Sequence, residues 1–153
     1  MLLDLLAIGD ATHAAVVVPG DDLALTYDQL RQQVEALTAQ LNQFGLGRGD
    51  RIAMALPNGL EVIASFFAAA TVGTAAPLNP AYTRDEFKYY LEDTGARALI
   101  VPRDDGDESR AAAADGVVII EADLTTIVRC AFRRQAPLIV GARTTTQRAM
   151  TGL

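Results

Sequence analysis

The chain has 153 residues, of which 50% are apolar and 21% are charged. This length suits one domain with one core, and the composition differs from that of chains that stay disordered. The net charge of −6, with Lys88 as the only lysine, argues against a nucleic-acid partner, because phosphate backbones are bound by clustered Lys and Arg. A single cysteine, Cys130, and a single histidine, His13, exclude an internal disulfide and a His/Cys zinc site. We therefore expect a reducing, cytoplasmic setting.

Neither a signal peptide nor a membrane span is predicted. Residues 1–6 are apolar apart from Asp4 and contain no basic segment, which a signal peptide requires. The uncharged run from Val62 to Tyr82 exceeds the ~18 residues of a membrane-spanning helix, but glycine and proline interrupt it. We expect this run to form a buried helix followed by a strand.

The first predicted elements are a hairpin and an amphipathic helix. Residues 15–18 and 23–25 are short apolar runs separated by Pro-Gly-Asp-Asp, which is typical of a β-hairpin. Thr26 and Gln29 then have the spacing of a capping box, which predicts the start of a helix. Four apolar residues share one face of this helix: Leu30, Val34, Leu37 and Leu41.

A strand and an unusually apolar helix come next. The glycine-rich residues 45–50 end the first helix, and residues 51–56 form an apolar run of strand length. The helix that follows, residues 60–72 with Asn58 as its predicted N-cap, is apolar on almost every face. A helix of this composition must be covered on most of its sides.

The second half of the body continues the alternation of helix and strand. Residues 75–78 form a short apolar strand, Thr83 and Glu86 predict a second capping box, and Gly95 predicts the end of that helix. Two further strands enclose an acidic loop: residues 97–101, 116–120 and the loop 102–115. The element order predicts an α/β fold, with a partial, mostly parallel sheet and flanking helices.

The composition changes after Asp123. Residues 124–153 contain five Arg and no carboxylate, whereas the preceding residues contain 8 basic and 19 acidic side chains. Beyond Val140 neither a helical nor a strand period is present. We therefore predict two parts, an incomplete body of residues 1–123 and a basic, poorly ordered tail of residues 124–153.

A glycine-rich motif at residues 45–49 is interpreted as a turn. A dinucleotide fingerprint would need glycine at position 50, where Asp50 stands, and would lie between a strand and a helix. Here the motif lies between a helix and a strand, which favours a helix C-cap and turn. The tripeptide Arg48-Gly49-Asp50 is interpreted as a coincidental match to adhesion motifs.

The remaining candidates also favour structural interpretations. The acidic residues of 104–108 lack the spacing of a calcium loop, and neither Ser65 nor Ser109, the only serines, lies in a G-x-S-x-G motif. Residues 144–146, three threonines, lack the glycines and the lysine of a phosphate loop, and Arg84 is interpreted as a surface arginine. We therefore assign no catalytic, cofactor-binding or metal-binding residue.

Three stretches of the sequence carry a family resemblance. They are LTYDQL at residues 25–30, GLGRGDRIAMALPNGLEVIASFFAAATVGTAAPLNPAYTRDEF at residues 45–87, and LEDTGARALIV at residues 91–101. In order and spacing they resemble the N-terminal part of the AMP-forming acyl-CoA synthetases, of the adenylate-forming (AMP-binding) superfamily. The resemblance implies the N-terminal subdomain of that fold. It also implies a ligase that uses ATP and Mg²⁺ to convert a fatty or other carboxylic acid to an acyl-adenylate and passes the acyl group to coenzyme A.

The catalytic motifs of that family are not found in this sequence. The resemblance would require a phosphate loop with a lysine, a Thr-Glu motif, an aspartate for the ribose and a lysine in a mobile C-terminal domain. Phosphoryl chemistry depends on positioning and charge stabilisation, and one lysine without a phosphate loop provides neither. We therefore carry no catalytic residue over, and we expect this chain alone to bind no cofactor and to be inactive.

Three hypotheses of different classes remain open. The chain is a truncated ligase, one piece of a split ligase, or a small binding or scaffold domain that keeps the ligase subdomain as a platform. We expect it to associate with itself or with the missing remainder of the ligase through the apolar helix of residues 60–72, because incompletely covered apolar surface favours association.

Overall fold

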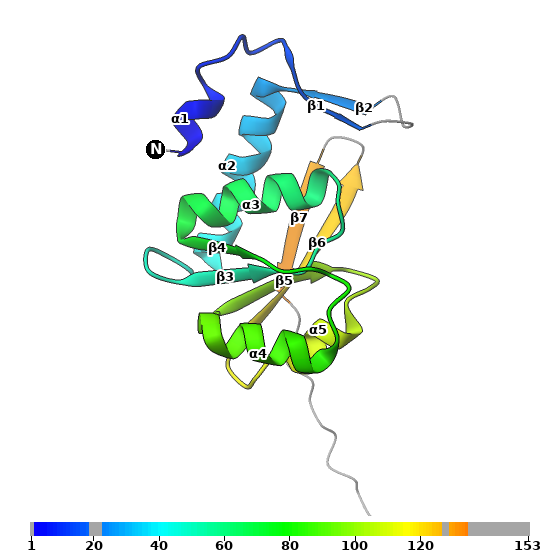
Figure 1. Ribbon diagram of the computed structural model, residues 1–153. Helices are drawn as coiled ribbons and strands as arrows, with labels where there is room; N and C mark the ends of the chain where they lie inside the picture. Colours follow the sequence, from blue (N-terminus) through cyan, green and yellow to red (C-terminus); the bar gives the residue numbers. More distant parts are fainter. Residues whose placement is uncertain (1, 19–22, 127–128, 135–153) are drawn as a thin grey trace, which may run out of the picture.

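The computed structural model describes residues 2–18, 23–126 and 129–134 (Figure 1). The helices are α1 (Leu2–Leu6), α2 (Tyr27–Gln43), α3 (Leu60–Val72), α4 (Arg84–Thr94) and α5 (Asp107–Ala112). The strands are β1 (Ala14–Val18), β2 (Leu23–Thr26), β3 (Arg51–Met54), β4 (Thr74–Pro77), β5 (Ala98–Pro102), β6 (Val118–Thr126) and β7 (Arg129–Arg134).

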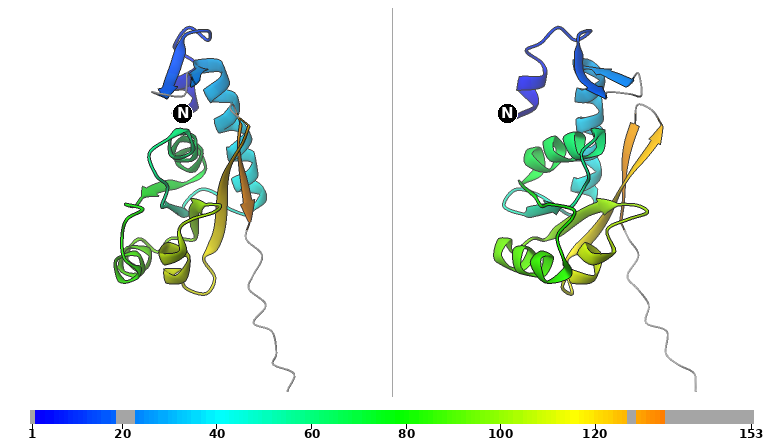
Figure 2. Two further views of the ribbon diagram at one scale, coloured as in Figure 1. Left: turned by 90° about the vertical axis from the view of Figure 1, so that its right-hand side faces the viewer. Right: turned by 45° about the vertical axis from the view of Figure 1, so that its right-hand side comes forward.

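The fold is a layered α/β structure. One sheet has the strand order β4-β3-β5-β6-β7, in which β4, β3, β5 and β6 are parallel and β7 is antiparallel to β6. Helices α2 and α3 lie on one face of this sheet, and α4 and α5 lie on the other (Figures 1 and 2). The predicted fold class, with a mostly parallel sheet and flanking helices, is confirmed.

The N-terminal hairpin and its following helix form as predicted. Strands β1 and β2 pair antiparallel, while the predicted turn at 19–22 lies outside the described residues. At the start of α2, the Thr26 hydroxyl accepts from the Gln29 amide at 3.2 Å and the Gln29 side chain accepts from the Thr26 amide at 2.9 Å. All four residues of the predicted apolar stripe are buried: Leu30, Val34, Leu37 and Leu41.

The parallel sheet is buried on both faces, because side chains of a strand alternate between them. Ile52 and Met54 of β3 belong to the core between the sheet and α2 and α3, whereas Ala53 belongs to the second core beneath α4. Ile100 and Leu99 of β5 divide in the same way. This explains why the strands read as continuous apolar runs in the sequence.

Helix α4 has the predicted ends. Thr83 and Glu86 form a capping box, in which the Glu86 carboxylate accepts from the Thr83 amide at 2.8 Å. Gly95 follows the helix in the left-handed conformation, with φ 58° and ψ 42°, which glycine adopts most readily. Phe87 and Leu91 point into the core, so the helix is fixed by its ends and by one apolar face.

Two local predictions are wrong. The N-cap of α3 is Gly59 rather than Asn58, because the bend after Pro57 continues to Gly59, whose extended backbone places the first helical residue at Leu60. The acidic segment 102–115 is not a loop throughout, since it contains α5. Two carboxylates in the first turn of α5 suit the helix dipole, and the alanines that follow favour helix.

Strand β6 is longer than predicted. It extends through Asp123 to Thr126 and pairs antiparallel with β7, so the proposed boundary after Asp123 lies within a strand. The rest of the predicted tail, residues 135–153, lies outside the described residues. Among the helices of the described ranges, none has the length and hydrophobicity needed to cross a bilayer.

Candidate functional site

The path of the chain creates a crevice at the carboxyl edge of the parallel sheet. From β3 the chain turns to α3 on one face, and from the neighbouring β5 it turns to α5 on the opposite face. Open α/β sheets bind ligands at such a switch point, just beyond the carboxyl ends of the strands, because the two connections diverge there. This edge is therefore the first place to look for a site.

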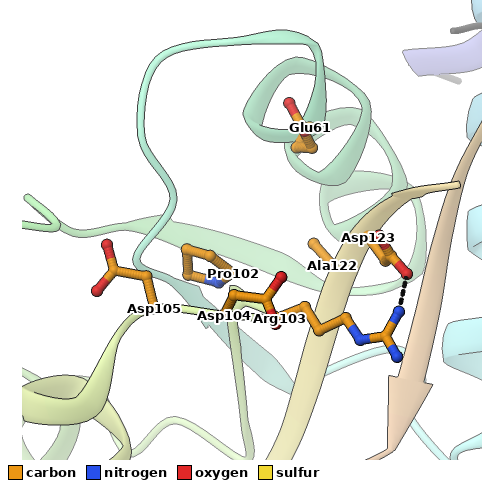
Figure 3. Close-up of a pocket in the computed structure, with 7 residues that line it drawn as sticks. All are labelled: Glu61, Pro102, Arg103, Asp104, Asp105, Ala122 and Asp123. Atoms are coloured by element: carbon orange, nitrogen blue, oxygen red, sulfur yellow. Dashed lines mark hydrogen bonds and ion pairs between the residues drawn. The ribbon is translucent and has the colours of Figure 1, made fainter.

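A depression of about 290 Å³ lies at this edge (Figure 3). Glu61 contributes from the first turn of α3, and residues 102–105 contribute from the segment that follows β5. Ala122 and Asp123 of β6 complete the lining. The depression thus joins three elements that lie far apart in the sequence.

The lining of this depression is acidic. It contains the carboxylates of Glu61, Asp104, Asp105 and Asp123, against the single guanidinium of Arg103. The Arg103 Nη1 lies 2.7 Å from Asp123 Oδ2, so this positive charge is already paired within the protein. An excess of carboxylates disfavours a polyphosphate, which needs positive charge or aligned backbone N–H groups.

Arg110 of α5 holds the segment that lines the depression. Its Nη1 donates to Glu121 Oε1 at 3.0 Å, and its Nη2 donates to the backbone carbonyls of Pro102 and, at 3.1 Å, of Arg103. Only 15% of the Arg110 side chain is exposed. Charge-assisted bonds of a partly buried guanidinium are among the stronger hydrogen bonds in proteins, so the loop after β5 is anchored to α5 and β6.

A second cluster fixes the opposite, amino edge of the sheet. Asp50 accepts from the Gly47 amide at 2.7 Å and from Arg97 Nη1 at 2.8 Å, while its backbone carbonyl accepts from the Thr74 amide at 2.9 Å. Asp50 therefore links the beginnings of β3, β4 and β5. The Arg97 guanidinium and the Gly47 amide lower the pKa of the Asp50 carboxyl, because both stabilise its charged form.

The two serines have structural surroundings. Ser109 is buried in α5 and donates to the Gly106 carbonyl at 2.8 Å. Ser65 is fully buried in α3, and its hydroxyl has no hydrogen-bond partner among the described residues. His13 lies before β1 and pairs at 3.8 Å with Asp10, so the structure gives no sign of a Ser-His-Asp arrangement in the described ranges.

The acidic residues that the sequence brings together are divided in the structure. Asp104 and Asp105 line the depression, whereas Asp107 and Glu108 lie in the first turn of α5. Arg84 Nε lies 3.8 Å from Glu108 Oε2, which links α4 to α5 on the surface. No three His, Cys, Asp or Glu side chains within the described ranges are placed to share a metal ion.

Two groups of charged residues at the edges of the sheet were not predicted from the sequence. Neither the Asp50–Arg97 pair nor the Arg110 anchor was predicted, since each depends on which strands and helices become neighbours. Asp50 directly precedes β3 and Arg97 directly precedes β5, so the adjacency of these two parallel strands would have placed the two residues together. The sequences GRGD at residues 47–50 and TGAR at residues 94–97 therefore hold the beginnings of β3 and β5 together.

Comparison with known proteins supports one family. The family model described as AMP-binding enzyme matches residues 8–142. The probable CoA ligase CCL9 of Humulus lupulus is 39% identical over 100 residues, which are 65% of this chain and 19% of that protein. The mitochondrial medium-chain acyl-CoA ligase ACSF2 of Homo sapiens is 36% identical over 90 residues, 58% of this chain and 15% of that protein.

A solved structure shows the same arrangement of elements. The N-terminal domain of FACL13 from Mycobacterium tuberculosis superposes with a TM-score of 0.68 at 27% identity, covering 77% of this chain and 32% of that one. Against the two curated ligases, the matched segment spans less than a fifth of the relative's length. The similarity is thus to one portion of a larger fold.

Proposed function

Because the chain belongs to the AMP-binding enzyme family, we propose that it serves as the N-terminal subdomain of an AMP-forming acid–CoA ligase. The observation that carries this proposal is the family match over residues 8–142, in a chain whose sheet and helices follow the N-terminal part of that fold. The reaction of the assembled ligase would join a carboxylic acid to coenzyme A through an acyl-adenylate, with ATP and Mg²⁺. We propose a fatty acid as one such substrate. We also propose that the ligase acts in the cytoplasm.

We propose that this chain alone does not catalyse adenylation. The acyl-adenylate forms when a carboxylate attacks the α-phosphorus of ATP and pyrophosphate leaves, so positive charge must face the phosphates. In this chain the depression at the switch point carries carboxylates and one arginine that is already paired. Lys88, the only lysine, lies on the exposed surface of α4.

Pyrophosphate exchange tests this proposal. The purified chain is incubated with ATP, Mg²⁺, labelled pyrophosphate and a panel of short, long and aromatic acids. We expect label in ATP no higher than in a buffer blank, because the depression offers the leaving pyrophosphate four carboxylates and one arginine that is already paired. Acid-dependent exchange clearly above the blank would contradict the proposal, and the human medium-chain acyl-CoA ligase ACSF2 with a medium-chain acid provides the positive control.

We further propose that the basic segment of residues 124–153, which begins within β6 and includes β7, is more accessible to protease than the rest of the chain. Limited trypsin digestion should then cut first in this segment, at one of five sites: Arg129, Arg133, Arg134, Arg143 or Arg148. Initial cleavage at Arg51 or Arg97, which lie in or beside central strands, would contradict the division.

A further inference from the structure

Strand β7 is the last strand of the five-stranded sheet and pairs on one side only. Its partner is β6, and among the described residues no strand pairs with its other side, which we call the free edge of β7 (Figures 1 and 2). Helix α2 packs beside β7, so the strand is held by the body of the protein. The N–H and C=O groups of such an edge can pair with another extended chain. We propose that the free edge of β7 binds, as an added strand, an extended segment of another protein that is rich in Asp and Glu.

The pairing of β6 determines which backbone groups point to the free edge. The Val118 amide donates to the Arg97 carbonyl, on the β5 side, at 3.0 Å, and successive residues of a strand turn their backbone groups to alternate sides. Asp123, an odd number of positions further along, therefore turns its N–H and C=O toward β7, where it lies opposite Ala131. Cys130, next to Ala131, accordingly turns its N–H and C=O toward the free edge.

The other edge of the sheet, at β4, is less suited to accept a strand. Thr74 and Leu78 direct their amides toward β3, so Pro77 faces the open edge of β4 in the alternating pattern. Proline has no N–H and prevents a regular ladder there. The sequence of β7, RCAFRR, contains no proline. Addition of a strand is therefore favoured at β7 over β4.

The charge of β7 selects the kind of strand that fits. The sequence RCAFRR contains three arginines and no carboxylate, whereas residues 1–123 carry 8 basic and 19 acidic side chains. Opposite charges on neighbouring strands stabilise the pairing and like charges weaken it. A second copy of β7 would bring arginines next to arginines, whereas a strand with Asp and Glu complements them. This inference goes beyond the proposed function and does not depend on it, because it uses only the sheet and its charges.

Peptide binding to the full chain tests the proposal. The probes are two fluorescently labelled peptides of equal length, one with alternating Glu and Thr and one with alternating Lys and Thr, and fluorescence anisotropy measures their affinities. Cys130→Pro removes an N–H at the free edge, where proline is tolerated in a strand, and Cys130→Ala is the matched control that keeps this N–H. Circular dichroism confirms that each variant is folded.

A charge-swapped variant provides a second test, which decides if Cys130→Pro does not fold. Arg129→Glu combined with Arg134→Glu keeps every backbone N–H of β7 and reverses two of its three charges. Arg133 is kept, because it lies opposite Glu121 of β6. If charge selects the added strand, this variant should prefer the lysine peptide.

We expect the wild type to bind the glutamate peptide at least about tenfold more tightly than the lysine peptide. Cys130→Pro should weaken binding of the glutamate peptide at least about tenfold, and Cys130→Ala should change it less than about twofold. Three results would overturn the proposal: no saturable binding of the glutamate peptide by the wild type, equal binding by folded Cys130→Pro and Cys130→Ala, or an unchanged preference in the charge-swapped variant. A wild-type dimer in light scattering that Cys130→Pro dissociates would also overturn it, and would identify a second copy as the occupant.

Discussion

Helices α3 and α4 lie on opposite faces of the same sheet and are built in different ways (Figure 2). The surface of α4 is almost entirely polar, its N-terminus has a capping box and its C-terminus has a left-handed glycine. Helix α3 exposes the aromatic ring of Phe66, and its N-cap, Gly59, makes no side-chain hydrogen bond. The surface of α4 therefore suits contact with water, whereas the surface of α3 includes an exposed apolar ring.

This difference lies in the surfaces of the helices that cover the two faces of the sheet. Polar residues on α4 mark a surface that stays in contact with solvent, since charged side chains are rarely buried without partners. On α3, by contrast, an aromatic side chain, Phe66, stays 39% exposed. The helices on the two faces of one sheet therefore present surfaces of different polarity.

The largest expected effect comes from truncating an aromatic residue of each helix. Phe87 of α4 is 1% exposed, so Phe87→Ala should lower the free energy of unfolding by about 3–5 kcal/mol, through lost burial and a cavity. Phe66→Ala should lower it by only about 1–2 kcal/mol, because Phe66 is incompletely buried. Urea unfolding followed by circular dichroism measures both, and equal losses would break the comparison.

The next largest effect is expected from replacing the glycine that follows each helix by alanine, which should cost more unfolding free energy after α3 than after α4. A Cβ at Gly73, after α3, would lie 2.4 Å from the Asp50 carbonyl oxygen, so Gly73→Ala forces the turn apart. We expect a loss of about 1–3 kcal/mol in unfolding free energy. At Gly95, after α4, the cost is that of a left-handed alanine, about 1 kcal/mol.

Gly47→Ala is the control for Gly73→Ala. A Cβ at Gly47 meets nothing within 4 Å, and its amide still donates to Asp50. Stability of Gly47→Ala should therefore stay close to that of the wild type. Equal midpoints in urea for Gly73→Ala and Gly47→Ala would show that the close approach to Asp50 is not limiting.

Capping provides a smaller difference between the helices. Thr83→Ala removes the hydroxyl that accepts from the Glu86 amide, and should cost about 1 kcal/mol in unfolding free energy. Thr83→Ser keeps the hydroxyl and should restore most of the loss. If Ser and Ala behave alike in thermal unfolding, the side-chain cap contributes nothing measurable to α4.

The smallest expected effect is the part of the pH dependence of stability that the capping box of α4 contributes. Hydrogen bonds from the Thr83 amide and hydroxyl lower the pKa of Glu86, because they stabilise its carboxylate. This stabilisation is complete above the unfolded value of about 4.3 and is lost as the pH falls through the lower, folded value. Stability of the wild type should therefore fall more steeply than that of Glu86→Gln below about pH 4. Parallel pH profiles of the two proteins would contradict this.

Local signals in the sequence predicted most of the fold. Thr26 and Thr83, each followed three residues later by Gln or Glu, located two helix starts, and Gly95 located one end. The N-cap of α3 was misplaced because Asn58 has the right chemistry but lies one residue too early. Helix α5 was missed since six residues are too few to establish a period.

The candidate site was less predictable than the fold. Glu61, Asp105 and Asp123 meet at one depression only because β3 and β5 are neighbours whose connections leave on opposite faces. Composition indicated an acidic surface loop but not this convergence. The apolar composition of residues 60–72, by contrast, already predicted that α3 needs covering on most sides, and Phe66 shows which side remains open.

The most direct test of the difference between α3 and α4 is chemical labelling of the folded chain. Phe66→Cys and Phe87→Cys are each made in a Cys130→Ser background, and maleimide reaction rates are measured under native conditions. Phe66 is 39% exposed and Phe87 is 1% exposed, so the thiol at position 66 should react at least about tenfold faster, because a buried thiol reacts only after local opening. Equal reaction rates at the two positions in folded variants would contradict the account.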